Sequence, residues 1–362
     1  MKIWIDKLAQ EGGLSRKEWT EFIENRSQAD HEYLFEKARA VRERIYGRDI
    51  YLRGLIEFSS YCKNDCFYCG LRASNRFAQR YRLTKDEVLE CCKTGYELDF
   101  RTFVLQSGED PYFTDAAMVD IISTIRANYP DCAITLSMGE KSRESYQKLF
   151  DAGADRYLLR HETANPQHYE KLHPPSLSLE NRIRCLHDLI ETGYQVGAGF
   201  MVGSPEQTTQ CLVDDMLFLK EINPQMVGIG PFIPHKNTPF GGQPQGTLEL
   251  TLFMLACLRL MLPNTLLPAT TALGTICANG RELGIMAGAN IIMPNLSPKK
   301  VREKYLPYDG KISTGDEAAE SYQRIRKKME NIGYNVAVSR GDCAGFEMTK
   351  SFTRFSTPVS IP

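Results

Sequence analysis

The sequence predicts an α/β fold, a complete (β/α)8 TIM-type barrel with helices before it and an extension after it. Eight short apolar segments of strand length recur along the chain, and amphipathic segments of helix length separate most of them. Strands that alternate with helices pair in parallel through right-handed crossovers, and eight such units can close into a barrel. An open doubly wound sheet is the alternative, but the number of strands favours closure.

Residues 1–47 are expected to form an N-terminal helical extension. Ser15 can cap a helix, because Glu18 stands at the capping-box position three residues later. Apolar residues spaced three or four apart predict another helix between about residues 27 and 46.

The barrel is expected over residues 48–297. Its candidate strands are 50–58, 102–106, 133–137, 156–160, 195–201, 226–230, 266–270 and 289–293. The segments between them predict helices at about 84–98, 115–128, 142–152, 178–192, 208–221, 248–262 and 275–287. Residues 298–362 are expected to form a C-terminal extension that packs on the barrel, with one more helix at 316–332. Chemistry in such a barrel belongs at the C-terminal ends of the strands.

Composition and charge exclude several classes of function. The chain has 362 residues, 42% of them hydrophobic, and its 44 basic side chains balance 45 acidic ones. This balance gives no support to binding of nucleic acid or of an anionic membrane. The first residues mix charges with apolar side chains, so we expect no signal peptide, no membrane span and a cytoplasmic location. Eleven cysteines without a secretion signal indicate free thiols in a reducing setting.

Three cysteines stand in one short loop directly after the first expected strand. Cys62, Cys66 and Cys69 follow the spacing C-x3-C-x2-C, and no fourth cysteine lies close behind them. A structural zinc site needs four protein ligands, whereas three thiolates on a cubane iron–sulfur cluster leave one iron free for a substrate. The cluster is therefore preferred over zinc. The spacing, with the aromatic Tyr68 just before the third cysteine, resembles that of radical S-adenosylmethionine (SAM) enzymes.

The radical SAM resemblance implies a 4Fe-4S cluster whose free iron chelates SAM, and a one-electron cleavage that releases a 5′-deoxyadenosyl radical. Tyr68 would then pack against adenine or wall the cluster. Ser107, Gly108 and Glu109 follow the second expected strand and resemble the family's GGE turn, which binds the SAM ammonium group. A turn cap is the alternative for that segment.

Two further segments resemble SAM-binding sequences. The stretch from Gly199 to Glu206 reads G-x-M-x-G-x-x-E, with Met201 in its third position, and is similar to the family's adenine-supporting G-x-I-x-G-x-x-E pattern. Glu162 and Arg182 could clamp the amino-acid end of SAM through charge-assisted hydrogen bonds. The P-loop motif is missing from the sequence, which argues against a P-loop enzyme.

Arginines and threonines after other strands suggest an anion site. Arg156 and Arg160 are an even number of residues apart, so both can face the barrel interior. Buried cations need an anion, which is either a protein carboxylate or a ligand bearing carboxylate or cyanide. The hydroxyl groups of Thr270 and Thr271 could bind a small anion, although helix capping explains Thr271 almost as well.

Longer stretches across residues 50–296 are similar to the HydE family of FeFe-hydrogenase maturases. The stretches that carry this resemblance are 56–59, 68–72, 105–112, 153–163, 226–235 and 268–271. The resemblance implies that the cluster is bound by Cys62, Cys66 and Cys69. It implies contacts to SAM or the bound small molecule from Ser137, Glu162 and Arg182, and an anion site deep in the barrel lined by Arg156, Arg160, Thr270 and Thr271.

The resemblance also implies an activity and partners. The family's radical acts on a cysteine-bound Fe(CO)2(CN) precursor delivered by the maturase HydG, in assembly of the hydrogenase H-cluster. The expected partners are this organometallic or another amino-acid-derived substrate and, transiently, other maturases, in an anaerobic cell. One departure stands out, because residues 310–316 lack the three cysteines that hold a second cluster in some family members. We therefore expect no second cluster.

Three other functions stay open. A carbon-skeleton mutase of the 3-methylornithine synthase type shares the Gly-Glu-Asp-Pro-Tyr turn found here at 108–112. A HydE-like enzyme of another pathway would keep the same SAM-binding residues. A non-catalytic iron–sulfur scaffold would keep the cysteines but has no need for the other SAM-binding segments.

Overall fold

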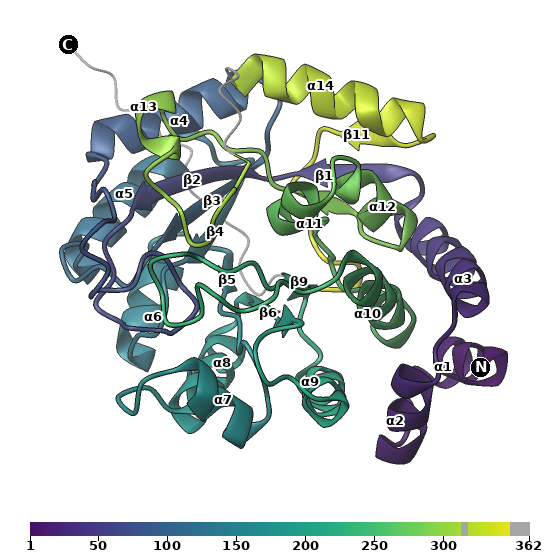
Figure 1. Ribbon diagram of the computed structural model, residues 1–362. Coiled ribbons are helices and arrows are strands. Elements are labelled where there is room, and N and C mark those ends of the chain that lie inside the picture. Colours follow the sequence, from purple (N-terminus) through teal and green to yellow (C-terminus); the bar gives the residue numbers. More distant parts are fainter. Residues whose placement is uncertain (313–317, 348–362) are drawn as a thin grey trace, which may run out of the picture.

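Residues 1–312 and 318–347 are described by a computed structural model (Figure 1). The helices are α1 (Lys2–Glu11), α2 (Arg16–Glu24), α3 (Gln28–Tyr46), α4 (Lys85–Glu97), α5 (Asp115–Asn128), α6 (Arg143–Asp151), α7 (Pro166–Leu172), α8 (Leu179–Thr192), α9 (Thr209–Ile222), α10 (Leu248–Met261), α11 (Thr271–Ile276), α12 (Gly280–Met286), α13 (Lys299–Arg302) and α14 (Ala318–Asn331). The strands are β1 (Asp49–Leu52), β2 (Gly54–Ser59), β3 (Thr102–Ser107), β4 (Ala133–Ser137), β5 (Arg156–Leu158), β6 (Gln195–Ala198), β7 (Met201–Val202), β8 (Met226–Val227), β9 (Gly230–Pro231), β10 (Ile291–Ile292) and β11 (Asn335–Ala337).

Six parallel strands form the main sheet, in the order β2-β3-β4-β5-β6-β8. Helices that connect successive strands lie along its outer side (Figure 1). Every residue of β2 is buried, as expected for a strand covered on both faces. The α/β class and the parallel pairing predicted from the sequence are thereby confirmed.

Closure of the sheet into a complete barrel is not found as one continuous ladder. Beyond β8 the described residues form single parallel bridges instead. These bridges join Met226 to Leu266, Pro268 to Ile291 and Leu55 to Asn295. The continuous strand expected at 266–270 is wrong, because Pro268 has no N–H group to donate to a neighbouring strand.

Three other expected strands are each divided into two shorter ones, and one of them, 226–230, becomes β8 and β9. The segment 50–58 becomes β1 and β2, and β1 pairs with β10 and β11 outside the main sheet. The segment 195–201 becomes β6 and β7, with Gly199 between them at a φ of 150°. A Cβ atom on Gly199 would lie 2.0 Å from the carbonyl oxygen of Gly228, so this close approach requires glycine.

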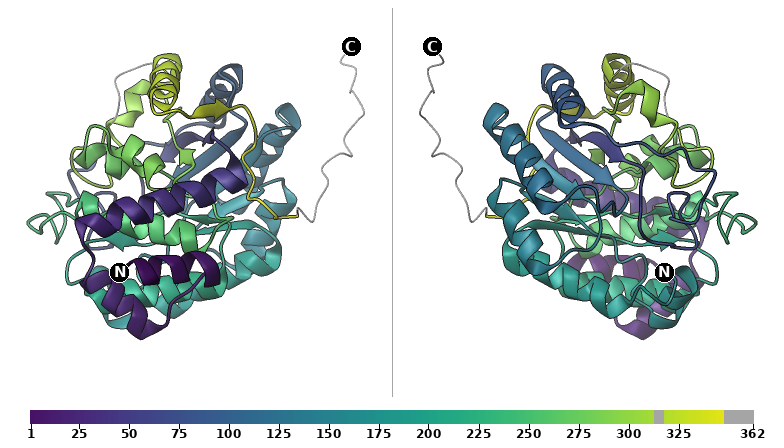
Figure 2. Two further views of the ribbon diagram at one scale, coloured as in Figure 1. Left: turned by 90° about the vertical axis from the view of Figure 1, so that its right-hand side faces the viewer. Right: turned by 90° about the vertical axis from the view of Figure 1, so that its left-hand side faces the viewer.

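The N-terminal helices lie along one side of the molecule (Figure 2), where α1 and α3 pack against α10 and α2 packs against α9. The capping box expected at Ser15 and Glu18 is present at the start of α2. The helix expected at 316–332 corresponds to α14, and the beginning of that expected range lies outside the described residues. No helix in the described ranges 1–312 and 318–347 is both long enough and apolar enough to cross a membrane.

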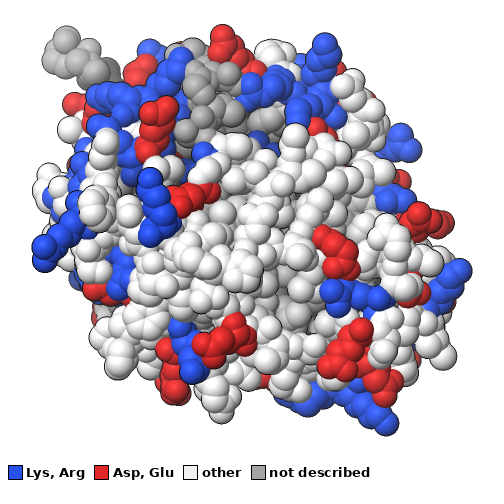
Figure 3. Space-filling model, in the orientation of Figure 1, with Lys and Arg blue, Asp and Glu red and all other residues white. Residues whose placement is uncertain are grey.

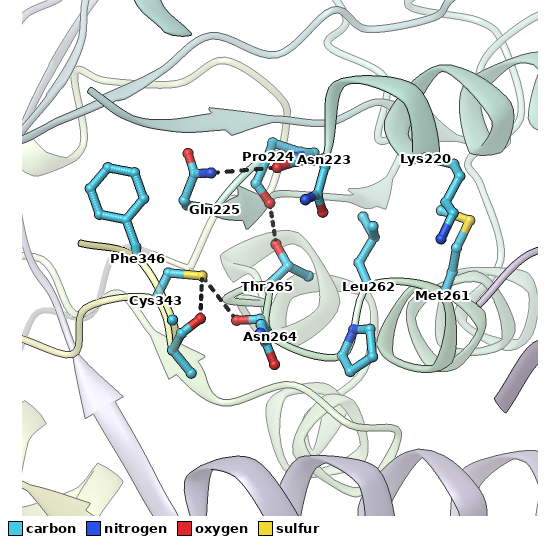
Figure 4. Close-up of a pocket in the computed structure, with 13 residues that line it drawn as sticks. Lys220, Asn223, Pro224, Gln225, Met261, Leu262, Asn264, Thr265, Cys343 and Phe346 are labelled. Atoms are coloured by element: carbon cyan, nitrogen blue, oxygen red, sulfur yellow. Dashed lines mark hydrogen bonds between the residues drawn. The ribbon is translucent and has the colours of Figure 1, made fainter. Parts of the chain in front are cut away.

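The segment after β11 crosses the end of the barrel where the strands begin. Arg340 donates hydrogen bonds to Asp155 and to the Cys132 carbonyl, both at 3.0 Å, and these residues directly precede β5 and β4. A surface pocket lies nearby (Figure 4), where the Cys343 thiol donates to the Asn264 carbonyl at 3.1 Å. This pocket lies at the end of the barrel opposite to the cysteine loop, which follows the end of β2.

Candidate active site

Three other segments hold the cysteine loop at the C-terminal ends of the strands. The backbone hydrogen bonds run from Lys63 to Glu109 (2.9 Å), from Phe67 to Leu172 (2.9 Å) and from Gly70 to Pro307 (2.8 Å). Cys62, Cys66 and Cys69 are free, half-buried thiols in this loop. The loop is therefore held in place at the barrel rim and carries three half-buried thiols.

Burial keeps the three thiols protonated when no metal is bound. It raises the pKa of Cys69 to about 12 and raises the pKa of Cys62 and Cys66 above the ordinary value as well. The Glu109 N–H group donates to the Cys62 sulfur at 3.4 Å, which stabilises a thiolate at that position. Metal binding must therefore release protons from the loop.

The arrangement of possible ligands speaks against a mononuclear zinc site. Within residues 1–312 and 318–347, no three histidine, cysteine, aspartate or glutamate side chains are so placed that they could hold a metal ion together. Zinc would need all its sulfur ligands about 2.3 Å from one point, whereas each thiolate on a cubane binds its own iron. Three thiols without a close fourth ligand therefore fit a cubane cluster better than zinc.

The Ser107-Gly108-Glu109 turn lies directly against the cysteine loop. A Cβ atom on Gly108 would lie 2.2 Å from the Tyr61 carbonyl oxygen and 2.7 Å from the Cys62 Cβ, so the contact depends on glycine. The Glu109 carboxylate accepts the Glu140 N–H group at 3.0 Å. The turn thus connects the ends of β2, β3 and β4 beside the cysteines, as the sequence predicts from strand order.

Arg160, Glu162 and Arg182 come together after β5. Arg160 Nη2 lies 3.1 Å from Glu162 Oε2, and Arg182 donates to the Arg160 carbonyl at 3.3 Å. Arg182 also lies 2.7 Å from the Glu140 carboxylate, a partner that the sequence did not reveal. Burial lowers the pKa of Arg182, but Glu140 and its neighbours outweigh that effect and raise it overall.

The polar atoms of this group are incompletely satisfied. Among the described residues, Arg160 Nε is buried without a partner, and Arg160 Nη2 and Glu162 Oε2 are buried with their mutual ion pair but without an aligned hydrogen bond. Glu162 also has a positive φ of 66°, an uncommon conformation for a residue with a side chain. Buried polar atoms without partners are costly, so this group fits a ligand that carries both a cation and an anion, such as an amino acid.

Tyr68 is held by histidine beside this group. Its hydroxyl lies 3.3 Å from His173 Nε2, and His173 Nδ1 lies 3.0 Å from the Tyr169 carbonyl oxygen. Burial lowers the pKa of His173 to about 3, so the neutral ring donates from Nδ1 and accepts from Tyr68. Burial is the main cause that raises the pKa of Tyr68, and the negative charge of Glu162 raises it further. The Tyr68 hydroxyl therefore stays protonated where it lines the site.

The remaining residues predicted to bind SAM lie at neighbouring strand ends. Ser137 ends β4 opposite Gln106 of β3. Met201 in β7 packs with Phe232, and Tyr68 packs against the same cluster. The structure therefore brings Ser137, Met201 and the Gly199 break to the same end of the sheet as the cysteine loop.

Arg156 is not part of this group. It begins β5, whereas Arg160 follows the end of that strand, so the two arginines lie toward opposite ends of the barrel. Its guanidinium group donates to Asp342 at 2.5 Å and to the Thr102 hydroxyl at 3.1 Å. Arg156 and Arg340 hold the pKa of Asp342 below its ordinary value, although burial raises it. The protein carboxylate, the alternative left open by the sequence, is the partner of Arg156.

Thr270 is the N-cap of α11 and Thr271 is its first residue, at the end of the barrel that carries the cysteine loop. The Thr270 hydroxyl is buried and has no hydrogen-bond partner within the residues described. Thr271 accepts a hydrogen bond from Arg281 Nη2 at 3.3 Å, and Arg281 was not predicted from the sequence. The Thr271 hydroxyl therefore lies next to the Arg281 guanidinium, and this cation favours an anion near the start of α11.

A segment of the C-terminal extension covers this end of the barrel. Lys311 reaches inward to Glu57 of β2 at 2.5 Å, and the two side chains are only 6% and 2% exposed. Asn295 also donates to the Glu57 carboxylate at 2.8 Å. An acidic residue within the apolar strand 54–59 was a signal of a buried partner, but nothing in the sequence pointed to Lys311.

A buried histidine next to the site gives a prediction about pH. His161 Nδ1 accepts the Gly199 N–H group at 3.3 Å, and its Nε2 lies 3.2 Å from Asp215. Burial lowers the pKa of His161 from 6.5 to about 3. Between about pH 6.5 and pH 3, the His161 ring binds a proton in the unfolded chain but not in the folded chain. His161 therefore lowers the free energy of unfolding as the pH drops below about 6.5.

His161→Asn is therefore expected to flatten the loss of stability in acid, by at most about 1.4 kcal/mol per pH unit. The asparagine oxygen can still accept the Gly199 N–H group, and Asp215 is present in both chains. The measurement is the free energy of unfolding in urea at pH 7, 6 and 5. Equal slopes for the two chains would show that His161 does not titrate as described.

The chain is similar to known proteins over most of its length. Residues 56–219 match the family model described as the radical SAM superfamily. The chain is 46% identical over 325 residues to the FeFe hydrogenase maturase subunit HydE of Thermotoga maritima, covering 88% of this chain and 92% of that protein. It is 29% identical over 334 residues to 3-methylornithine synthase of Methanosarcina barkeri, covering 92% and 93%.

Solved structures show the same fold. A crystal structure of methylornithine synthase superposes with a TM-score of 0.82 at 28% identity, over 92% of this chain and 97% of that one. The maturase HydG from Carboxydothermus hydrogenoformans superposes with a TM-score of 0.76 at 23% identity, over 92% and 78%. At that identity the second likeness concerns the fold alone.

Proposed function

The chain belongs to the radical SAM superfamily and, within it, to the HydE family of FeFe-hydrogenase maturases, and from this membership we propose that it processes a cysteine-bound Fe(CO)2(CN) precursor during H-cluster assembly. It is an enzyme that uses a 4Fe-4S cluster and SAM. When bound, these cofactors supply a 5′-deoxyadenosyl radical. The proposed partners are this small substrate and, transiently, other hydrogenase maturases in the cytoplasm.

Cys62, Cys66 and Cys69 are the proposed cluster ligands. The proposal is supported by the position of these three half-buried free thiols in one loop that three other segments hold in place. The Glu109 N–H group would stabilise the sulfur of Cys62 as a thiolate. The other residues of the chain then position SAM and the substrate and exclude water.

Glu162 and Arg182 are proposed to bind the amino-acid end of SAM, with Ser137 beside them. Glu162 Oε2 supports this role, because it is buried and lacks an aligned hydrogen bond within the described chain. The Ser107-Gly108-Glu109 turn would present backbone groups to the SAM ammonium. Tyr68, Gly199 and Met201 would enclose the adenosyl group.

Arg160, Thr270 and Thr271 are proposed to hold the anionic end of the substrate. The observation that carries the proposed function is the presence of two buried polar atoms without partners among the described residues, Arg160 Nε and Thr270 Oγ1, at the cysteine-loop end of the barrel. A carboxylate or a cyanide group would satisfy them. Arg156 has no part in this proposal, since Asp342 already pairs with it.

We further propose that the sheet closes into a complete eight-stranded barrel. The single bridges from Met226 to Leu266, from Pro268 to Ile291 and from Asn295 to Leu55 support this closure, because they continue the parallel order from β8 back to β2. A closed wall with the segment 303–312 across one end would shield a reactive substrate from water.

A mutase of the 3-methylornithine synthase type is the second candidate. Its support is the TM-score of 0.82 with methylornithine synthase, over almost the whole of both chains. The greater identity to HydE favours the maturase. The two candidates differ in substrate, because the resemblance to 3-methylornithine synthase implies lysine as the substrate of such a mutase. Parallel reactions can offer the same enzyme either lysine or the organometallic precursor.

Arg160→Ala is expected to keep the cluster but to slow substrate turnover about 10- to 100-fold, which corresponds to the loss of a charged hydrogen bond worth about 1.5–3 kcal/mol. The assay uses anaerobically reconstituted protein with dithionite and SAM, and follows product formation from the Fe(CO)2(CN) precursor. Iron content serves as the control for an intact site. Arg160→Lys, which keeps the charge but not the planar fork, should recover only part of the activity.

Unchanged turnover of the precursor by Arg160→Ala would remove Arg160 from the substrate site. Turnover of lysine but not of the precursor by the unmodified enzyme would instead favour the mutase.

A further inference from the structure

Arg281 in α12 carries a positive charge that no carboxylate compensates among the described residues. Its Nε atom is buried without a hydrogen-bond partner. The neighbouring acidic residue, Glu282, pairs instead with Lys328 at 2.6 Å. Burial lowers the pKa of Arg281, as expected for a cation that is removed from water. A buried charge without a counter-charge is costly, so Arg281 is a candidate for binding an anionic ligand.

The surface over Arg281 does not supply the missing anion. A Cβ atom on Gly274 would lie 3.5 Å from Arg281 Nε, so the guanidinium group lies across α11. Figure 1 places α11 and α12 near the middle of the face that Figure 3 also shows, and the described side chains around this middle are largely uncharged. An anion that reaches Arg281 is therefore expected to belong to a ligand.

Arg281 faces the same space as Arg160. Tyr308 lies in the segment that covers this end of the barrel. Burial is the main cause that raises the pKa of Tyr308 to about 12, and the positive charges of Arg281 and Arg160 both oppose this rise. Charges act on a group in this way only from nearby, so both arginines lie close to Tyr308. The preceding residue, Pro307, accepts the Gly70 N–H group of the cysteine loop at 2.8 Å. A ligand bound to Arg281 would therefore lie beneath the covering segment, on the side of the cysteines.

The two arginines differ in the charge that they still require. Arg160 Nη2 lies 3.1 Å from the Glu162 carboxylate, so its positive charge already has a partner. Arg160 Nε lacks only a hydrogen-bond acceptor, and the nitrogen of a cyanide group is such an acceptor. Arg281 lacks a full negative charge, which a carboxylate carries. The two groups therefore suit two different ends of one ligand.

The geometry at Arg281 also suits a carboxylate. Its Nη2 atom donates to the Thr271 hydroxyl at 3.3 Å, and its Nε atom is free. These two nitrogen atoms form one edge of the planar guanidinium group, the kind of edge that donates two parallel hydrogen bonds to a carboxylate. The Thr271 hydroxyl accepts from Arg281 and keeps its own proton to donate to the same ligand.

We propose that Arg281, assisted by Thr271, binds the α-carboxylate of an amino-acid substrate. This proposal rests on the proposed function, because cysteine supplies such a carboxylate in the Fe(CO)2(CN) precursor. Arg160 and Thr270 are then left for the cyanide group. No bond forms or breaks at Arg281, which holds the substrate in place. Lysine, the substrate of the second candidate function, carries an α-carboxylate as well.

Arg281→Met keeps the length of the side chain and removes its charge. It is expected to raise the KM of the precursor about 10- to 100-fold, the effect of losing a charged hydrogen bond, while kcat stays within about threefold. A precursor built on cysteinamide lacks the negative charge. It should show the same high KM with the unmodified enzyme and with Arg281→Met. Arg281→Lys should recover part of the affinity for the carboxylate.

Arg326→Met is the matched control. It makes the same change of charge at a 54% exposed arginine of α14, and it should leave both KM values as in the unmodified enzyme. Urea unfolding without ligand tests whether Arg281 has a structural role. Arg281→Met should unfold at the same urea concentration as the unmodified chain or at a higher one, because it loses no ion pair.

Three results separate this proposal from its alternatives. The proposal is wrong if the unmodified enzyme has no preference for the carboxylate, or if Arg281→Met retains that preference. A lower urea midpoint together with an unchanged KM would assign Arg281 to the fold instead. If the unmodified enzyme turns over lysine but not the precursor, the proposed function alone fails, and the same comparison between lysine and lysinamide decides the role of Arg281.

Discussion

Cys66→Ala is expected to abolish both the iron–sulfur cluster and SAM cleavage. Cys66 is the middle one of the three thiols, and alanine offers no atom that binds iron. Two remaining thiolates would leave two irons without a protein ligand, and such a cluster does not survive in water. The reconstituted unmodified chain should hold about four irons. The variant should hold almost none and form no detectable 5′-deoxyadenosine with dithionite.

Cys92→Ala is the matched control for this experiment. Cys92 lies in α4 and is fully buried, so its removal also deletes one thiol but leaves the loop unchanged. It should keep the iron and the activity of the unmodified chain. Iron retained by Cys66→Ala, or zinc in the unmodified loop, would contradict the assignment of the cluster ligands. Clearly more than about four irons per chain would contradict the expectation of a single cluster.

Lys311→Ala is expected to destabilise the fold by about 3–5 kcal/mol. The substitution removes the cation that lies 2.5 Å from Glu57 and leaves this carboxylate buried, with only Asn295 donating to it among the side chains described. Lys311 also donates to the Tyr305 carbonyl at 2.9 Å, so the segment over the barrel loses an attachment at the same time. Urea unfolding at pH 7 measures the loss.

The double variant Glu57→Gln with Lys311→Met tests the cause. It removes both charges while keeping side chains of similar size, so most of the lost stability should return. The glutamine oxygen can still accept the hydrogen bond from Asn295. If the double variant is as unstable as Lys311→Ala, the unpaired charge of Glu57 is not the reason for the loss.

Short-range features of the site could be predicted from the sequence. Cys62, Cys66 and Cys69 lie within one loop, and their spacing alone indicated three ligands and an open position. Gly108 and Glu109 follow the next strand, so parallel strand order was enough to place them beside the cysteines. The capping box at Ser15 is equally local, and it is found as predicted.

Long-range partners could not be predicted in this way. Arg156 was grouped with Arg160 by its spacing, but the strand carries it to the other end of the barrel, where Asp342 arrives from the C-terminal extension. Arg182 meets Glu140, and Lys311 meets Glu57, across equally unrelated stretches of sequence. The expected strand at 266–270 depended on an unbroken ladder that Pro268 does not allow.

The sequence by itself determined the alternation of strands and helices, the three-cysteine loop and the end of the strands at which the site lies. All of these depend on residues that are neighbours in the chain, where turn chemistry, apolar periodicity and ligand spacing act directly. Only the tertiary structure decided which carboxylate each buried arginine or lysine meets and which polar atoms remain open to a ligand. The physical reason is that a buried charge pairs with whatever oppositely charged group folding brings within a few ångströms, and sequence distance does not limit that choice.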